Sequence, residues 1–236
     1  MTLRRARTAG FSVASMAGLA AASYAAWVGV AWLRYGHAAP ARPEDVDAFL
    51  DRFMPDYDVV ERHHVRVVAP ADVTFGALMD MDLEDSRIIR AIFKGRELLL
   101  AADADAKPRA RGLVAVTKEL GWGVLTEMPG REIVMGAVTQ PWQPNVVFRA
   151  IPPAEFAAFN ESDYVKIAWT LRVDALGEGQ SMARTETRAI ATGAEARRRF
   201  RWYWARFSPG IVLIREVSLR LVQKEAERRT RTVGQS

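Results

Sequence analysis

Apolar residues recur along the chain with two different periods, and each period predicts one type of secondary structure. From Val165 to Asp174 apolar and polar residues alternate, which is the two-residue period of a β-strand that packs one face against a core. From Phe200 onward apolar residues recur at intervals of three and four, which is the period of an amphipathic helix. The chain therefore combines a sheet with helices, and the pattern predicts an α+β fold.

The middle of the chain is predicted to form most of the sheet. The β-branched run "ERHHVRVVAP" (61–70) predicts a strand that stops at its proline. Two further strands in 122–142 are joined at Met128-Pro129-Gly130-Arg131, where proline followed by glycine is typical of a type II turn. The runs 146–153 and 181–192 predict two more strands. Thr185 and Thr187 lie on one face of the last strand, and Glu186 lies on the other with its two arginine neighbours.

Helices are predicted on both sides of these strands. The stretch 71–102 has the spacing of two helices that break near 83–85, and short helices are expected at 44–53 and 154–159. The charged, apolar-poor stretch 103–112 predicts an exposed loop. These elements give the order strand, two helices, several strands and a C-terminal helix.

The C-terminal helix is predicted to start at Thr192, because Glu195 follows three residues later as in a capping box. Pro209 lacks a backbone donor and clashes with the preceding turn, so the helix should bend at 208–210 before it ends near Arg228. Its apolar stripe should cover a sheet, since the opposite side carries charges. The stripe comprises Phe200, Trp204, Phe207, Ile211, Ile214 and Leu221.

The N-terminal segment from Ala9 to Leu33 has no charged residue and follows three arginines. As a helix it would be roughly 37 Å long, enough to cross a hydrocarbon layer of about 30 Å, and we expect a single-pass membrane anchor. The alternative is a secretory signal peptide cleaved near Ala39-Pro40-Ala41. The flanking arginines favour an N-terminus inside, which would place the domain outside the cytoplasm.

These features divide the chain into four parts. Residues 1–35 are the expected anchor, 36–55 a proline-bearing linker with a short helix, 56–228 the folded domain and 229–236 a disordered tail.

Charge and composition narrow the classes of function. The formal net charge is +5, and the excess of arginine sits near the two ends of the chain. Such clusters suit anionic lipid headgroups or nucleic acid, but the C-terminal arginines share their helix with acids, which is typical of a solvated helix face. We therefore expect no nucleic-acid partner. The absence of cysteine excludes disulfides, thiolate metal sites and cysteine nucleophiles.

The order of elements resembles the SRPBCC or START-like superfamily, also called the helix-grip, Bet v 1-like or polyketide cyclase-type fold, and the last block resembles a bacterial subgroup of it. The residues that carry the resemblance are "VRVVAPADVTFGAL" (65–78), "PGREIVMGAV" (129–138), "TETRAIAT" (185–192) and "RRFRWYWARFSPGIVLIREVSLRLVQKEA" (198–226). It covers roughly residues 58–228. The resemblance implies a curved antiparallel sheet wrapped around the long C-terminal helix, with an apolar cavity between them.

The resemblance also implies a function. Members of the superfamily bind lipids, sterols or polyketides, and some are cyclases or aromatases. We therefore expect a membrane-anchored domain that binds a hydrophobic small molecule or lipid between the sheet and the helix. The residues expected to line that cavity are Met135, Trp142, Phe148, Trp169, Leu171, Trp204, Phe207 and Ile211.

Two alternatives remain open. One is a cyclase-like or hydrolytic enzyme in which Glu186, turned into the cavity with a pKa raised by burial, acts as general acid or base; turned outward, Glu186 would belong to an ordinary salt-bridge ladder. The other is a structural or interaction module whose core has collapsed, which a cavity below roughly 300 Å³ would favour. We expect no metal or cofactor, since His63 and His64 are neighbours on one strand and face opposite sides.

Overall fold

A computed structural model describes residues 2–82, 86–100 and 112–233; within these ranges the side chains of 2–15, 93, 96–98 and 233 lie outside the description. The predicted helix break at 83–85 and nearly all of the predicted loop at 103–112 therefore fall outside the described residues. The elements run in the order α1 (Thr2–Arg34), a short 3₁₀ helix (Pro43–Asp45), α2 (Ala48–Phe53), β1 (Val59–Val67), α3 (Ala71–Met79), α4 (Arg87–Leu100), α5 (Leu113–Glu119), β2 (Gly123–Met128), β3 (Glu132–Thr139), β4 (Phe148–Arg149), α6 (Pro153–Phe156), β5 (Val165–Gly177), β6 (Gln180–Ala191) and α7 (Ala194–Val233).

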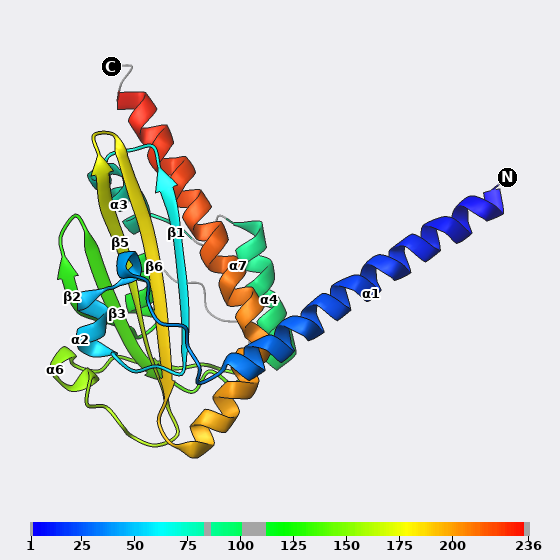
Figure 1. The fold of residues 1–236 in the computed structure, drawn as a ribbon, viewed down its shortest axis with the longest axis horizontal. Coiled ribbons are helices and arrows are strands. Elements are labelled where there is room, and N and C mark those ends of the chain that lie inside the picture. Colours follow the sequence, from blue (N-terminus) through cyan, green and yellow to red (C-terminus); the bar gives the residue numbers. More distant parts are fainter. Residues whose placement is uncertain (1, 83–85, 101–111, 234–236) are drawn as a thin grey trace.

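The six strands form one antiparallel sheet in the order β1-β6-β5-β3-β2, with β4 paired to β3 (Figure 1). The predicted hairpin between β2 and β3 is confirmed. Gly130 has φ +75°, and the Arg131 N–H donates to the Met128 carbonyl at 3.1 Å, as a type II turn requires.

The long helix α7 lies along one face of the curved sheet with α3 and α4 beside it, and α2 and α6 lie on the other face (Figure 1). This is the helix-grip arrangement that the resemblance implied, and it confirms the predicted α+β class. Helix α7 is continuous over 40 residues with Pro209 inside it, and Figure 1 shows its direction change after the first few turns. It starts two residues later than predicted. Thr192 does not cap it, because the Thr192 hydroxyl instead bonds the backbone of Glu161 and Tyr164.

Strand β5 alternates as predicted, but both of its faces are covered. Trp169 and Leu171 pack into the core under α3 and α7, whereas Ala168 packs with α2 and α6. The polar residues Thr170 and Arg172 are buried on that second face as well, at 2 % and 9 % exposure. The sequence pattern predicts which way each side chain points, while the cover over the polar face comes from distant segments.

The N-terminal segment is helical, as predicted, but the helix α1 is not separate from the folded domain, because it contacts α7. Figure 1 shows its first turns projecting away from the sheet and its last turns lying against α7. The expectation of a transmembrane helix finds no support among the described residues, none of whose helices is both long and apolar enough to cross a bilayer.

Candidate functional site

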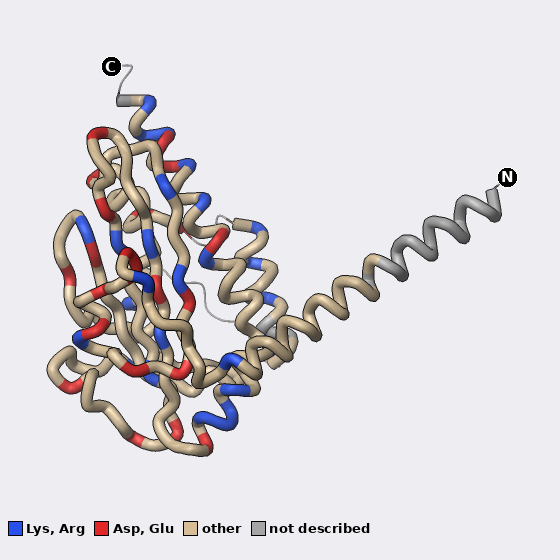
Figure 2. The backbone as a smooth tube through the Cα atoms, in the orientation of Figure 1, with Lys and Arg blue, Asp and Glu red and all other residues tan. Residues whose placement is uncertain are grey.

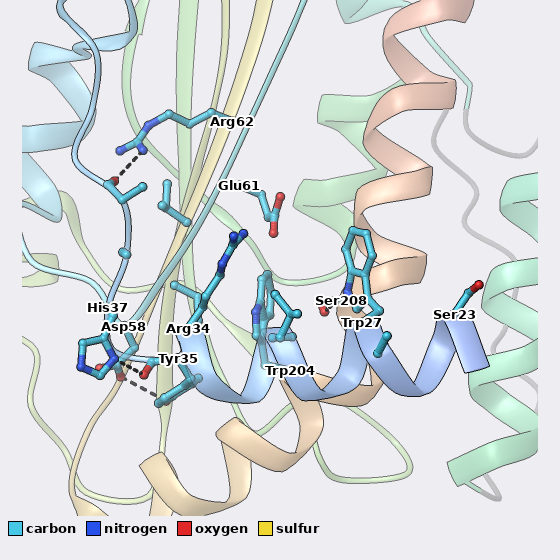
Figure 3. A pocket seen from close by; sticks show the side chains of 17 residues that line it. Ser23, Trp27, Arg34, Tyr35, His37, Asp58, Glu61, Arg62, Trp204 and Ser208 are labelled. Carbon is cyan, nitrogen blue, oxygen red and sulfur yellow. Dashed lines mark hydrogen bonds between the residues drawn. The ribbon is translucent and has the colours of Figure 1, made fainter. Parts of the chain in front are cut away.

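A groove of about 560 Å³ lies between the last turns of α1, the start of β1 and α7 (Figure 3). Trp27 and Val30 come from α1, Trp204 from α7, and the backbone of β1 around Val59 and Val60 closes the far side. Strand β1 is at the edge of the sheet and pairs only with β6, so its free edge borders this space. The groove exists because α1 meets the domain at an angle.

Specific polar contacts hold the last turns of α1 against α7. The Tyr24 hydroxyl donates to the Arg206 carbonyl at 2.9 Å, and the Trp27 indole N–H donates to the Ser208 hydroxyl at 3.1 Å. Arg201 donates two hydrogen bonds, at 2.8 and 3.0 Å, to the Trp32 carbonyl near the end of α1, and its guanidinium lies over the Trp32 ring. These bonds tie one wall of the groove to the other.

A buried carboxylate fixes the floor at the end of α1. Asp58, only 4 % exposed, accepts hydrogen bonds from the Tyr35 hydroxyl at 3.2 Å and from the Ala191 N–H at 2.9 Å. Its other oxygen lies 3.0 Å from the Arg197 guanidinium. Burial, reinforced by the Asp58 charge, raises the pKa of the Tyr35 hydroxyl, so Tyr35 remains a donor across the physiological pH range.

The groove is apolar along its length and charged at one end. Figure 3 shows Arg34 rising from α1 toward Glu61 of β1, next to the tryptophan-lined part. Glu61 lies 3.4 Å from the His63 ring, and Arg62 is engaged by Glu186 and Tyr57. Arg34 forms no ion pair with any residue in the described ranges. An apolar trough with a few polar groups at one end is typical of sites for hydrophobic small molecules.

The space between the sheet and α7 is much smaller than the groove. A cavity of about 30 Å³ lies there, bordered by Leu171 and Thr185 of the sheet and by Leu219 and Val222 of α7. Three predicted cavity residues, Met135, Trp169 and Leu171, belong to the core cluster around it and are almost fully buried. They pack tightly against α3 and α7.

The other predicted cavity residues lie elsewhere. Trp204 and Ile211 belong to a second cluster around the end of α1, where Trp204 lines the groove, and Trp142 packs against the same cluster. Phe148 stacks near Trp122 with ring centroids 5.0 Å apart, and half-buried Phe207 contacts the Tyr203 ring at 4.8 Å. The structure thus places three of the predicted residues with each of two clusters, and Phe148 and Phe207 with neither.

Glu186 faces away from α7. Its carboxylate lies 2.7 Å from Arg188 Nε and 3.1 Å from Arg62 Nε, and Arg188 in turn bonds Asp51 and the Met54 carbonyl from the N-terminal segment. The outward orientation agrees with the salt-bridge alternative, yet Glu186 is only 4 % exposed because the segment around α2 covers it. The Glu186 carboxylate is paired with two guanidinium groups on this face. It lines neither the groove beneath α1 nor the cavity between the sheet and α7.

The same outer face carries a carboxyl pair. Glu132, which is 4 % exposed, accepts a hydrogen bond from the Thr170 hydroxyl at 3.2 Å. Burial, together with the neighbouring Asp47 charge and hydrogen bond, raises the pKa of Glu132 to about 7, against the opposing effect of Arg172. Asp47 also caps α2 by accepting the Leu50 N–H at 2.8 Å. Glu132 therefore titrates near neutrality beneath the covering segment.

Several charges along α7 form local pairs. Figure 2 shows basic and acidic positions interleaved along α7, and Glu225 bonds both Arg228 and Arg229 at 2.8 Å. These contacts lower the pKa of Glu225 to about 2. Within the described residues no three His, Asp or Glu side chains are placed to hold a metal ion. His63 Nε2 lies 3.4 Å from a carboxylate oxygen of Glu61, two residues before it on β1.

The sequence analysis missed the groove because it assigned the whole apolar run 9–33 to a membrane anchor or signal peptide and so predicted no packing partner for it. Tyr24, Trp27 and Ala31 recur at intervals of three and four, which places them on one helix face. That face meets α7 in the structure. The spacing was a signal for helix packing, but no sequence feature named the partner helix.

Comparisons with known proteins give fold-level likenesses only. No family model matches the chain, and no curated protein matches it. Among solved structures, a hypothetical protein from Helicobacter pylori aligns with 80% of this chain and 96% of its own length, at 9% identity and TM-score 0.38. The ZhuI aromatase/cyclase from Streptomyces sp. R1128 aligns with 74% of this chain and 97% of its own length, at 16% identity and TM-score 0.28.

CalU16 from Micromonospora echinospora aligns with 75% of this chain and 88% of its own length, at 13% identity and TM-score 0.25. At such low identities and TM-scores the likenesses supply no ligand and no reaction for this chain.

Proposed function

We propose that this chain is a binding domain for a hydrophobic small molecule or lipid, and that the groove beneath α1 holds the ligand. The observation that carries the proposal is the groove itself: about 560 Å³, walled by Trp27, Val30 and Trp204, with charged groups gathered at one end. Ligand pockets usually span roughly 300–1,000 Å³ and have this composition.

The groove supports binding better than the sheet–helix space does. An apolar ligand gains about 25 cal/mol for each Å² of apolar surface that it removes from water, so affinity requires room for extended contact. The cavity of about 30 Å³ between the sheet and α7 has room for little more than two water-sized groups. A lipid-sized ligand fits the groove without displacing packed core residues.

The neutral fluorophore N-phenyl-1-naphthylamine tests the proposal on the full chain. We expect saturable fluorescence enhancement with the wild-type protein and at least tenfold weaker binding by Val30→Trp, whose larger side chain fills the groove from a position that is 47 % exposed. Leu33→Trp, one turn further and outside the lining, is the matched control and should bind normally. Absence of uptake by the wild-type protein contradicts the proposal and favours the interaction module.

We also propose that α1 attaches this domain to a membrane, with the N-terminus inside and the domain outside the cytoplasm. The support is the uncharged stretch 9–33 and the large exposed apolar side chains on the described part of α1, including Met16, Leu19 and Leu33. Figure 2 shows that the described turns of α1 carry no charge until they reach the body. A ligand taken from a bilayer would then enter beside the helix that meets it.

Fractionation of cells that express the full chain tests this attachment. We expect the wild-type protein in the carbonate-washed membrane fraction and release of Leu19→Arg, which puts a charge on the projecting part of α1. Val147→Arg changes an equally exposed residue on the body and should remain in the membrane fraction. A wild-type protein found wholly in the soluble fraction, or one that ends up there after signal cleavage, contradicts the anchor.

A further inference from the structure

Arg215 is a cation enclosed between α7 and the sheet without a carboxylate to neutralise it. Its guanidinium donates to the Thr187 hydroxyl at 3.0 Å and lies 5.7 Å from the centre of the Trp169 ring. Part of the side chain reaches solvent, but protein surrounds the charged group. Burial lowers the pKa of Arg215 to about 10, so the group is still cationic at neutral pH.

The enclosed arginines of the sheet, unlike Arg215 of α7, form ion pairs with carboxylates. Arg188 bonds Glu186 and Asp51 at 2.7 and 2.6 Å, and Arg172 bonds Asp174 at 3.1 Å. Buried charges in proteins are normally paired in this way, because an isolated charge in a protein interior is costly. Arg215 has no ion pair among the described residues.

One acid acts on Arg215 from a distance. The charge of Glu61 opposes the lowering of the Arg215 pKa, but no ion pair joins them. Glu61 instead lines the groove and lies 3.4 Å from the His63 ring. The positive charge of Arg215 is therefore only partly balanced from within the described part of the chain.

The small sheet–helix cavity lies beside this cation. Arg215 lines it together with Thr185 and Ser218, while its other walls are apolar. Thr185, only 4 % exposed, has a buried hydroxyl oxygen without a hydrogen-bond partner. Buried hydroxyls are rarely left unpartnered, and such a group beside an unpaired guanidinium marks a place for an acceptor.

We propose that the cavity beside Arg215 binds a carboxylate group, with Arg215 as its charge partner and the Thr185 hydroxyl as a second donor. The volume of about 30 Å³ corresponds to roughly two water-sized groups, which matches the two oxygens of a carboxylate. This volume has room for the carboxylate alone, so an attached alkyl chain would have to extend beyond the cavity. This site is separate from the groove beneath α1 and does not depend on it.

Sodium formate is the probe for the site itself. We expect the unfolding midpoint of the full chain to rise by about 3 °C in sodium formate relative to sodium chloride at equal ionic strength, because a ligand that binds only the folded state stabilises it. Arg215→Met should abolish the rise, whereas Arg220→Met, an exposed arginine on the same helix, should preserve it.

A second variant keeps the proposal testable if Arg215→Met fails to fold. Thr185→Val removes only the unpartnered hydroxyl, so it should fold and show a smaller formate shift. Absence of a shift in the wild-type protein, or equal shifts in the wild-type protein and Thr185→Val, overturns the proposal and leaves ordered water in the cavity. Val30→Trp should retain the shift, which separates this site from the groove.

Dodecanoate distinguishes the two sources of the carboxylate. If the group belongs to an amphiphile, Arg215→Met should weaken dodecanoate binding at least tenfold. If it belongs to a free small acid, dodecanoate should bind both proteins equally while only the formate shift is lost. Equal formate shifts in the wild-type protein and Arg215→Met contradict the site whatever dodecanoate does.

Discussion

Trp27 of α1 donates its indole N–H to the Ser208 hydroxyl of α7 across 3.1 Å, one residue before the proline at which α7 lacks a backbone donor. The contact links residues 181 positions apart in the chain. It joins the helix that projects from the domain to the helix that spans the sheet. The groove beneath α1 depends on this junction.

Trp27→Phe should weaken the contact between α1 and α7 without leaving a cavity there. Phenylalanine keeps an aromatic ring against α7 but loses the hydrogen bond, which at a partly buried position contributes about 1 kcal/mol. We expect faster amide hydrogen exchange in the last turns of α1 and unchanged exchange in β5 and β6. Trp122→Phe changes a tryptophan that lies against Phe148 and Trp169 in the core cluster remote from α1, so exchange in α1 should not change. Identical exchange profiles for wild-type and Trp27→Phe would show that the bond does not hold α1.

The ion pair on the outer face should contribute far more than one at the surface. Arg188→Met leaves Glu186 buried with only Arg62 as partner, and breaking such a pair typically costs about 3–5 kcal/mol. Arg149→Met breaks an equally short pair with Glu161, in which both side chains are about half exposed, and should cost less than about 1 kcal/mol. Urea denaturation measures both, and similar losses would contradict the cover that the segment around α2 provides.

Glu132 predicts a pH dependence of stability. Its pKa is about 7 in the folded protein and 4.5 in the unfolded chain, so the folded state binds the extra proton between these values. Stability is therefore highest below about pH 4.5 as far as this group is concerned, and is lost as the pH rises from there through the folded pKa of about 7, by on the order of 3 kcal/mol.

Glu132→Gln should remove that slope, because glutamine keeps a hydrogen-bonding side chain beside Thr170 and Asp47 but cannot ionise. We expect the difference in unfolding free energy between the variant and the wild-type protein to favour the variant increasingly from pH 5 to about pH 7 and to level off by pH 8. Glu127→Gln, on the exposed part of β2, is the control. A constant difference across this range would show that Glu132 does not titrate there.

Two glycines with positive φ should respond differently to alanine. Gly121 has φ +99°, and a Cβ there would collide with the Phe148 carbonyl oxygen, whereas Gly130 has φ +75° and open space around it. Gly130→Ala should cost about 1 kcal/mol of backbone strain alone. Gly121→Ala should cost at least twice as much because the β4 backbone must also move, and equal unfolding free energies for the two variants would contradict that close approach.

The pattern of residues predicts the elements well where the signal is local. The alternation in β5, the turn at Pro129-Gly130 and the stripe of α7 with its interrupting proline each depend on neighbouring residues, and each appears in the structure. Helix α5 was not predicted, because its seven residues are too few to establish a period. The cap at Thr192 was assigned wrongly because its hydroxyl found partners across the turn from Tyr164.

The candidate site depends on contacts that no local pattern encodes. The groove arises from the meeting of α1, β1 and α7, and the burial of Glu186 arises from the segment around Asp51 folding over the sheet. Sequence periodicity gives the direction of a side chain but not which distant segment will cover it. For the same reason, the predicted cavity residues Trp169 and Trp204 fall into different clusters.

Native mass spectrometry of the full chain, incubated with one equivalent of a neutral long-chain alcohol such as dodecanol, tests the central claim most directly. We predict a one-to-one complex for the wild-type protein and for Leu33→Trp, and its loss in Val30→Trp. A wild-type protein that carries no alcohol, or a Val30→Trp protein that carries as much as the wild type, would contradict binding in the groove beneath α1.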